Sequence, residues 1–198
     1  MKIKPCTGQN IMNKKLSNLM LIANFISCLF YSASYPYIYA ETLKIVPKYF
    51  ISIESILACL STIIFCKMWN SFSDKLFKHY RKMLIAEIIA DIYLFLDVII
   101  RNDIKFYFLL NIIIFSIITK NLSCGGTKMR AIVNPDEKSR ESFDNNSSIV
   151  NALSTLLGAG FAMFINLDLT WLFVLALIGN TIDNIFYLHI YNNLMEEL

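Results

Sequence analysis

Charged residues are scarce in this sequence. Asp, Glu, Lys and Arg make up 17% of the 198 residues, whereas about a quarter is usual in soluble globular chains. Hydrophobic residues reach 56%, above the usual level of about 45–50%. Both deviations are typical of a chain whose main solvent is lipid, and they argue against a soluble enzyme. The net charge of +3 comes without a dense basic run, which argues against a nucleic-acid partner.

Sequence signatures of catalytic and metal chemistry are also missing. The five cysteines show neither a CxxC spacing nor a Cys/His spacing, so we expect no disulfide framework and no zinc site. They are expected to be small buried hydrophobic residues, namely Cys6, Cys28, Cys59, Cys66 and Cys124. His79 and His189 stand apart from acids and cysteines, and the chain contains no GxSxG, HExxH or phosphate-binding glycine loop. We therefore expect no enzyme activity, no metal and no cofactor.

Apolar runs recur six times along the chain. They cover about residues 16–40, 46–68, 83–100, 104–132, 149–165 and 169–188. Each run is long enough, or nearly so, to cross roughly 30 Å of hydrocarbon as a helix. Six spans leave only short loops, so the sequence predicts a single all-α polytopic membrane domain over residues 1–198. Within the first span, Pro36 predicts a kink or an early end of the helix.

The basic residues predict the orientation of these spans. Thirteen of the 18 Lys and Arg residues fall in the amino-terminal segment and in the loops after the second and fourth spans. Short basic loops stay in the cytoplasm. We therefore expect a multi-pass protein of the cell membrane with both termini cytoplasmic, including the segment 1–15. An alternative is that residues 1–34 are a cleaved signal peptide, and the other five spans then keep the same orientation.

The predicted loop between the second and third spans has a distinctive pattern. A small residue and Asp74 precede a basic cluster that includes Lys75, Lys78 and Arg81. This loop resembles the cytoplasmic loop between helices two and three of the major facilitator superfamily. Asn70 and Phe77 stand where that family has glycines. The resemblance implies that Asp74, Lys75, Lys78 and Arg81 form a conformational-switch loop, in which a carboxylate pairs with a neighbouring cation.

A second stretch resembles the same superfamily. Members often leave their fourth helix through small residues and then run through a Pro-acid-acid-x-x-Arg-like stretch, as this chain does from Gly125 to Arg140. Family members have two six-helix halves with the substrate cavity between them. The resemblance implies that this chain is similar to the amino-terminal half. It would then pair with a second copy, as a homodimer, or with another six-helix chain, and would carry a small solute by alternating access.

Charged and polar residues inside the spans mark candidate functional sites. Glu87 and Asp91 are four residues apart, so they share one helix face, and we expect one of them to pair with Lys120. Helices one and four line the cavity in the superfamily that the chain resembles. That resemblance implies a substrate path, for which the candidates are Asn24, Ser27, Tyr31, Ser116 and Lys120.

Two further helix faces are expected to serve packing. Asn180, Asp183 and Asn184 share a face of the last span, which we interpret as a packing or partner surface. Small residues at Ser154, Gly158 and Ala162 predict a ridge for close helix packing.

The preferred function is a secondary carrier of the major facilitator type, acting in the lipid bilayer on a small-molecule substrate that the sequence does not identify. One alternative is a six-span substrate-binding subunit of another transport system. Another is a non-transporting accessory membrane protein or a degenerate remnant.

Overall fold

The computed structural model describes residues 7–45, 48–101, 120–164 and 168–197. All regular secondary structure in these ranges is helical. The helices are α1 (Thr7–Ile45), α2 (Lys48–Lys78), α3 (Tyr80–Arg101), α5 (Lys120–Val133), α6 (Glu137–Phe164) and α7 (Leu169–Glu197). The all-α fold class is thereby confirmed for the part of the chain that the structure describes.

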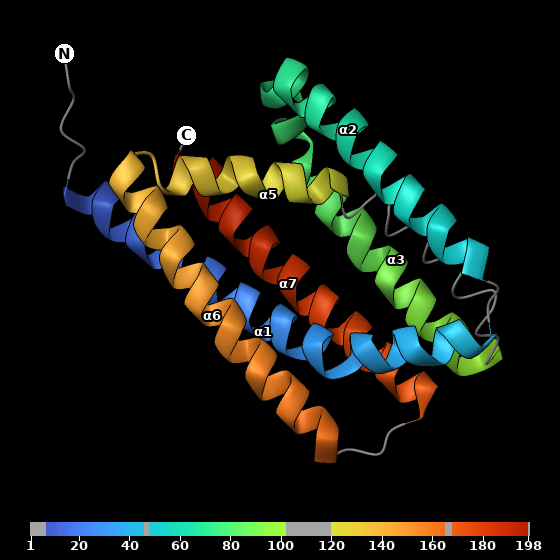
Figure 1. The fold of residues 1–198 in the computed structure, drawn as a ribbon. Helices are drawn as coiled ribbons and strands as arrows, with labels where there is room; N and C mark the ends of the chain where they lie inside the picture. The colour runs from blue at the N-terminus through green and yellow to red at the C-terminus, as the bar shows by residue number, and fades with distance from the viewer. Residues whose placement is uncertain (1–6, 46–47, 102–119, 165–167, 198) are drawn as a thin grey trace.

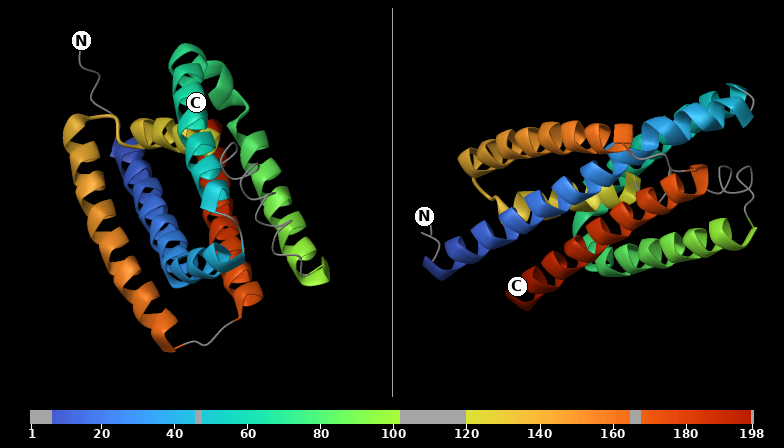
Figure 2. Two further views of the ribbon diagram at one scale, coloured as in Figure 1. Left: turned by 45° about the vertical axis from the view of Figure 1, so that its right-hand side comes forward. Right: turned by 90° about the horizontal axis from the view of Figure 1, so that it is seen from below.

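Four helices lie in a row, in the order α6, α1, α7, α3 (Figures 1 and 2). Each packs against the next, and the contacts of α1 with α7 and α6 are the most extensive. The shorter α5 runs across this row and also packs against α2. As a result α7 has α1 on one side and α3 on the other, which places it in the interior of the bundle.

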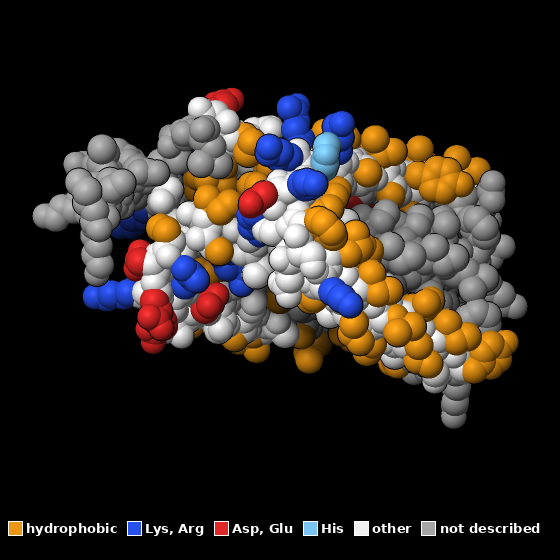
Figure 3. Space-filling view, turned by 90° about the horizontal axis from the view of Figure 1, so that it is seen from above, with side chains coloured by type: hydrophobic (Ala, Val, Ile, Leu, Met, Phe, Trp, Pro, Cys, Tyr) orange, Lys and Arg blue, Asp and Glu red, His pale blue; other side chains and the backbone are white. Residues whose placement is uncertain are grey.

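The chain ends and the basic segments lie at one end of the bundle. Both termini, the junction of α2 with α3 and the turn between α5 and α6 are found there (Figure 1). Lys and Arg side chains gather on this end, and hydrophobic side chains cover the adjoining flank (Figure 3). The positive charge that the sequence places in alternate loops is thus collected on one surface.

The outside of the bundle is apolar. Large hydrophobic side chains such as Phe164, Leu156 and Ile63 are 90%, 70% and 66% exposed. Four helical stretches are long and apolar enough to cross a membrane, namely Asn13–Ala40, Ser55–Lys78, Glu137–Phe164 and Thr170–Glu196. These stretches correspond to the first, second, fifth and sixth predicted spans. Most of the predicted fourth span, 104–132, lies outside the described residues, while α3 carries three acidic residues along its length.

The connection between α2 and α3 differs from the predicted loop. Helix α2 continues to Lys78, and only Phe72 leaves helical geometry, with φ −130° and ψ 26°. Asp74, Lys75 and Lys78 therefore lie on the last turns of a helix, and Arg81 lies on the first turn of α3. The absence of glycine explains the difference, because Asn70 and Phe77 do not end a helix as readily as glycine does.

Helix α1 passes through Pro36 and ends only at Ile45. Of the two predicted alternatives, a kink or an early end, the early end does not occur, and the helix changes direction along its length (Figure 1). Proline lacks the N–H that would bond to the carbonyl four residues earlier. Nearby, the Ser34 hydroxyl donates to the Phe30 carbonyl oxygen at 2.7 Å. Side-chain bonding of this kind is common where a helix bends.

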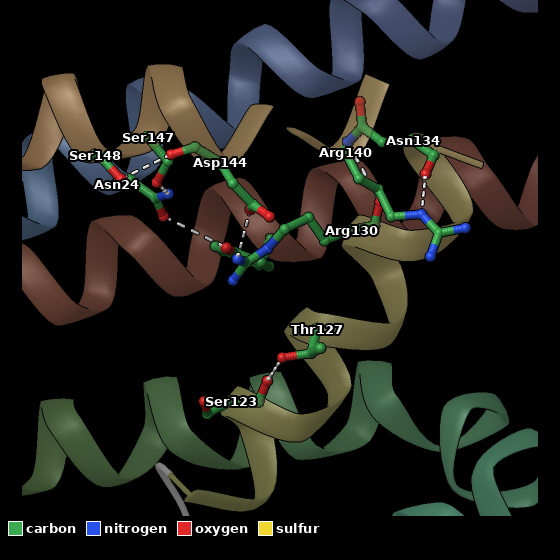
Figure 4. A network of polar contacts seen from close by, with 10 residues as sticks. Asn24, Ser123, Thr127, Arg130, Asn134, Arg140, Asp144, Ser147 and Ser148 are labelled. Carbon is green, nitrogen blue, oxygen red and sulfur yellow. Dashed lines mark hydrogen bonds and ion pairs between the residues drawn. The ribbon is translucent and has the colours of Figure 1, made fainter. Parts of the chain in front are cut away.

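The turn between α5 and α6 is stabilised by polar contacts. Asp136 caps α6 by accepting a hydrogen bond from the Ser139 backbone N–H at 2.9 Å. That bond holds the pKa of the Asp136 carboxyl below its ordinary value. Arg140 donates to the carbonyl oxygens of Asn134 and Pro135 at 3.0 and 2.6 Å (Figure 4). The Pro-acid-acid-x-x-Arg stretch is therefore a helix stop followed by a capped helix start.

Two predictions about packing have different outcomes. The ridge of Ser154, Gly158 and Ala162 is buried, as predicted, and Gly158 lies directly against the backbone of α1. The prediction of buried cysteines was wrong for Cys59 and Cys66, whose side chains are exposed on α2. Helix α2 packs mainly along the part of it that meets α5, so much of its surface faces outward. Cys28 and Cys124 are half-buried, and Cys6 lies outside the described residues.

Candidate functional site

A polar cluster lies between α3 and α7 in the interior of the bundle. Glu87 and Asp91 are 3% and 1% exposed, and their spacing of four residues turns both toward α7. The Asn180 side-chain nitrogen donates to the two Asp91 carboxylate oxygens at 3.1 and 2.9 Å and lies 3.2 Å from Glu87 Oε1. Thr181 donates to Asp91 at 3.3 Å. Amide and hydroxyl donors of α7 thus satisfy the α3 acids.

The cluster borders a cavity of about 190 Å³, which we call the polar cavity. Helices α3, α5 and α7 supply its walls. The lining residues are Tyr80, Glu87, Leu122, Ser123, Gly126, Arg130, Asn180, Asp183, Asn184 and Tyr187. The cavity is small, and polar and apolar groups contribute about equally to its surface, in contrast to the hydrophobic exterior of the bundle.

Close packing of α5 against two tyrosines shapes this cavity. A side chain at Gly125 would collide with the Tyr80 ring, and one at Gly126 would lie 3.4 Å from the Tyr187 ring. The Tyr80 hydroxyl donates to the Leu122 carbonyl oxygen at 3.1 Å. The two adjacent glycines therefore let α5 approach the tyrosines, which is the packing reason for small residues at the end of the predicted fourth span.

Three polar atoms of cavity-lining residues are buried without a hydrogen-bond partner among the described residues. They are Asp183 Oδ1, Asn184 Nδ2 and Arg130 Nε. The Arg130 guanidinium also forms an ion pair with Asp144 of α6, with 3.6 Å between Nη1 and Oδ1 (Figure 4). Buried polar groups are almost always paired, so one acceptor and two donors around one cavity indicate a place for a polar ligand or water.

One of the predicted substrate-path residues reaches the border of the polar cavity. Asn24 of α1 accepts a hydrogen bond from the Tyr187 hydroxyl at 3.5 Å and donates to Ser147 of α6 at 3.2 Å (Figure 4). Ser27 is half-buried and lies outside the cavity lining. Tyr31 is 52% exposed and stacks on Tyr35, with 4.5 Å between ring centroids. Tyr31 is therefore more exposed than Asn24, although the two residues are seven apart on α1 and lie on nearly the same helix face.

The predicted pairing with Lys120 lies outside what the structure describes, as do the Lys120 side chain and Ser116. Among the described residues, Asn180 contacts both Glu87 and Asp91, and Thr181 contacts Asp91. The pairing with Lys120 stays a prediction. The polar face of α7, formed by Asn180, Asp183 and Asn184, packs within the chain, as the interpretation of a packing surface required. The interpretation did not anticipate that this face meets the acids of α3 and lines the polar cavity.

The Asp74 carboxylate has a cationic partner on α5. Lys128 Nζ lies 2.5 Å from Asp74 Oδ1 and donates to the Ser73 hydroxyl at 2.5 Å. The same ammonium lies 5.4 Å from the centroid of the Phe77 ring. These contacts join α2 to α5. Lys75, Lys78 and Arg81 are exposed on the basic end of the bundle.

Sequence reasoning did not assign Arg130 and Tyr187 to a site, and it interpreted the face with Asp183 and Asn184 as a packing or partner surface. A signal was present, because Asn180, Asp183 and Asn184 follow a helical spacing that matches the spacing of Glu87 and Asp91. The chain matches no model of a known protein family, no curated protein and no solved structure. The arguments about function therefore depend on the geometry of this site.

Proposed function

We propose that the chain is a membrane-embedded carrier of a small polar solute, of the major facilitator type. The single observation that carries this proposal is the polar cavity. Acids and amides are buried in its walls, while Phe164, Leu156 and Ile63 are exposed on the outside. Burial of acids among apolar helices is expensive and is typical of a solute or ion pathway. The proposal includes six spans in the cell membrane and places the basic end in the cytoplasm.

The ion pair between Asp74 and Lys128 supports a carrier mechanism. It joins α2 to α5 at the basic end, and α5 also supplies Ser123, Gly126 and Arg130 to the polar cavity. A movement of α5 relative to α2 would therefore change both the ion pair and the cavity wall. Alternating access requires such a coupled movement between an end of the bundle and the solute site.

A second function is favoured by one specific observation. In the superfamily that the chain resembles, the solute cavity lies between two six-helix halves, whereas the polar cavity is lined by α3, α5 and α7 of one unit. A cavity of that kind suits a substrate-binding subunit that works with a separate energising module. Both functions predict solute binding, and only the carrier, as a homodimer, predicts flux without a separate energising module.

Reconstitution distinguishes these functions. Proteoliposomes containing the purified protein are tested for uptake of radiolabelled L-serine, choline, glycerol and lactate, which differ in charge. A carrier accumulates at least one probe above protein-free vesicles. We expect Asp183→Asn to abolish this uptake and Glu196→Gln, at the exposed end of α7, to preserve it. Binding of a probe without flux would favour the binding subunit, and neither binding nor flux would refute both functions.

The orientation is tested separately. A single cysteine at Lys78, introduced into a variant without the native cysteines, is treated with a membrane-impermeant maleimide on intact cells. Protection in intact cells and labelling after permeabilisation are expected, because Lys78 lies on the basic end. Labelling from the outside would contradict the proposed topology and with it the carrier function.

A further inference from the structure

We propose that the polar cavity binds a small zwitterion, with its ammonium at Asp183 and Glu87 and its carboxylate at Arg130 and Asn184. This inference rests on the proposed function, because it names the solute class of the same cavity. Its basis is the set of polar atoms that remain without a partner and the charges that surround them.

The unpartnered atoms require both a donor and an acceptor from the ligand. Asp183 Oδ1 accepts hydrogen bonds, whereas Asn184 Nδ2 and Arg130 Nε donate them. Asn184 is only 5% exposed, so bulk water does not satisfy its amide. A molecule with an ammonium at one end and a carboxylate at the other would satisfy all three atoms. Each resulting contact would be charge-assisted on at least one side.

The surrounding charges argue against ligands of one sign. Glu87 and Asp183 line the cavity, and Asp91 lies against it through Asn180, so a free anion would meet nearby carboxylates. Arg130 lines the same cavity and disfavours a purely cationic ligand on its side. A zwitterion places each charge beside its opposite and enters with no net charge, which lowers the cost of transferring it from water.

The volume sets the size of the ligand. A cavity of about 190 Å³ corresponds to roughly six water molecules at their share of liquid volume. An amino acid with a short side chain is of this size. A metal ion is a poorer fit, because no group of three or more His, Cys, Asp and Glu in the described ranges has a suitable arrangement. The chemistry and the size together favour a small amino-acid-like zwitterion.

Binding to the wild-type protein in nanodiscs tests the inference. Isothermal titration compares L-serine with ethanolamine, which lacks the carboxylate, and with lactate, which lacks the ammonium. We expect serine to bind at least about tenfold more tightly than either analogue, since lactate leaves the Asp183 carboxylate and ethanolamine leaves Arg130 Nε without the contact that serine supplies. Equal affinities, tighter binding of an analogue, or no binding because the cavity holds water only would overturn the proposal.

Two variants test which residue contacts the carboxylate of the ligand and which contacts its ammonium. Arg130→Gln is expected to remove the preference for serine over ethanolamine, and Asp183→Asn to weaken both ligands at least about tenfold. Asn193→Ala is the matched control, because Asn193 lies on α7 outside the cavity lining and donates to its own helix, at the His189 carbonyl oxygen. If a variant fails to fold, the comparison of the three ligands on the wild-type protein still tests whether the cavity prefers a zwitterion.

The outcome is separable from that of the carrier proposal. Serine that binds without crossing the proteoliposome membrane would support this inference and contradict the carrier. Flux of choline or glycerol, with no binding of serine, would support the carrier and overturn this inference.

Discussion

Replacement of Gly158 by alanine tests the central packing of the bundle. Gly158 lies on α6 where that helix approaches α1 most closely. A Cβ atom at this position would lie 2.5 Å from the Leu29 carbonyl oxygen and 3.1 Å from the Ala33 nitrogen. Both are backbone atoms, which cannot rotate away as a flexible side chain does. The two helices must therefore separate to admit a single methyl group.

The expected change in the free energy of unfolding is the difference between two opposing contributions. Overpacking of a close contact costs about 1–3 kcal/mol, whereas alanine is favoured over glycine in a helix interior by roughly 0.5–1 kcal/mol. We expect Gly158→Ala to lower the free energy of unfolding by about 1–2 kcal/mol. Gly160 is the matched control on the same helix, since a Cβ there meets nothing within 4 Å. The propensity term cancels between the two variants, so their difference isolates the overpacking.

The assay is reversible unfolding of the purified protein in mild detergent on addition of SDS. The fluorescence of Trp69 and Trp171 reports the transition. Gly160→Ala is expected to be as stable as the wild type or more stable, and Gly158→Ala clearly less stable than both. Equal stability of the two alanine variants would refute the close contact between α1 and α6, and with it the packing role of the small-residue ridge.

Three further predictions concern the basic end of the bundle and its attachment to α2. Copper phenanthroline is expected to link Cys66 to Cys124 by a disulfide within one chain, because their sulfur atoms are 3.9 Å apart. The protein would then lose two thiols that react with maleimide, and an unchanged number of reactive thiols would contradict the packing of α2 on α5. Asp74→Asn and Lys128→Gln are expected to change stability little, because Asp74 is exposed to solvent, yet each is expected to slow any uptake. Unchanged uptake in both variants would exclude a switching role for this pair. Because the pKa of Asp136 is lowered in the folded protein, its cap of α6 stabilises the fold fully above the unfolded pKa of about 4, and this stability is lost as pH falls through the folded pKa. Asp136→Ala is therefore expected to reduce the loss of stability on acidification. The same SDS titration, repeated at several pH values, measures this effect.

Much of the architecture could be predicted from the sequence, because it depends on local properties. Apolar runs of helical length predicted the helices α1, α2, α3, α6 and α7, and the spacing of small residues predicted the packing ridge on α6. The element boundaries were less accurate, since helices continue past the apolar runs until a real break such as Pro135 occurs. Nothing in the composition of the α2–α3 connection forces a loop, and the helix therefore runs on.

The candidate site was predicted only in part. The shared face of Glu87 and Asp91 was recognised from their spacing, but their partner Asn180 lies 93 residues beyond Glu87 in the chain. Lys120 was the expected partner because helices that follow one another in sequence are often neighbours. That pairing lies outside the described residues and stays a prediction. What the sequence did not anticipate is that α7 packs beside α3 and supplies Asn180.

The sequence by itself determined that the chain forms long helices with an apolar exterior and that its basic residues gather at one end. These properties depend on residue type and on a period of 3.6, both of which are local. Only the tertiary structure decided that Asn180 serves the α3 acids and that Arg130, Asp183 and Asn184 border one cavity. Such contacts depend on which helices pack together and at what height along their axes. That arrangement is a balance of the packing of all the helices, which no single segment specifies.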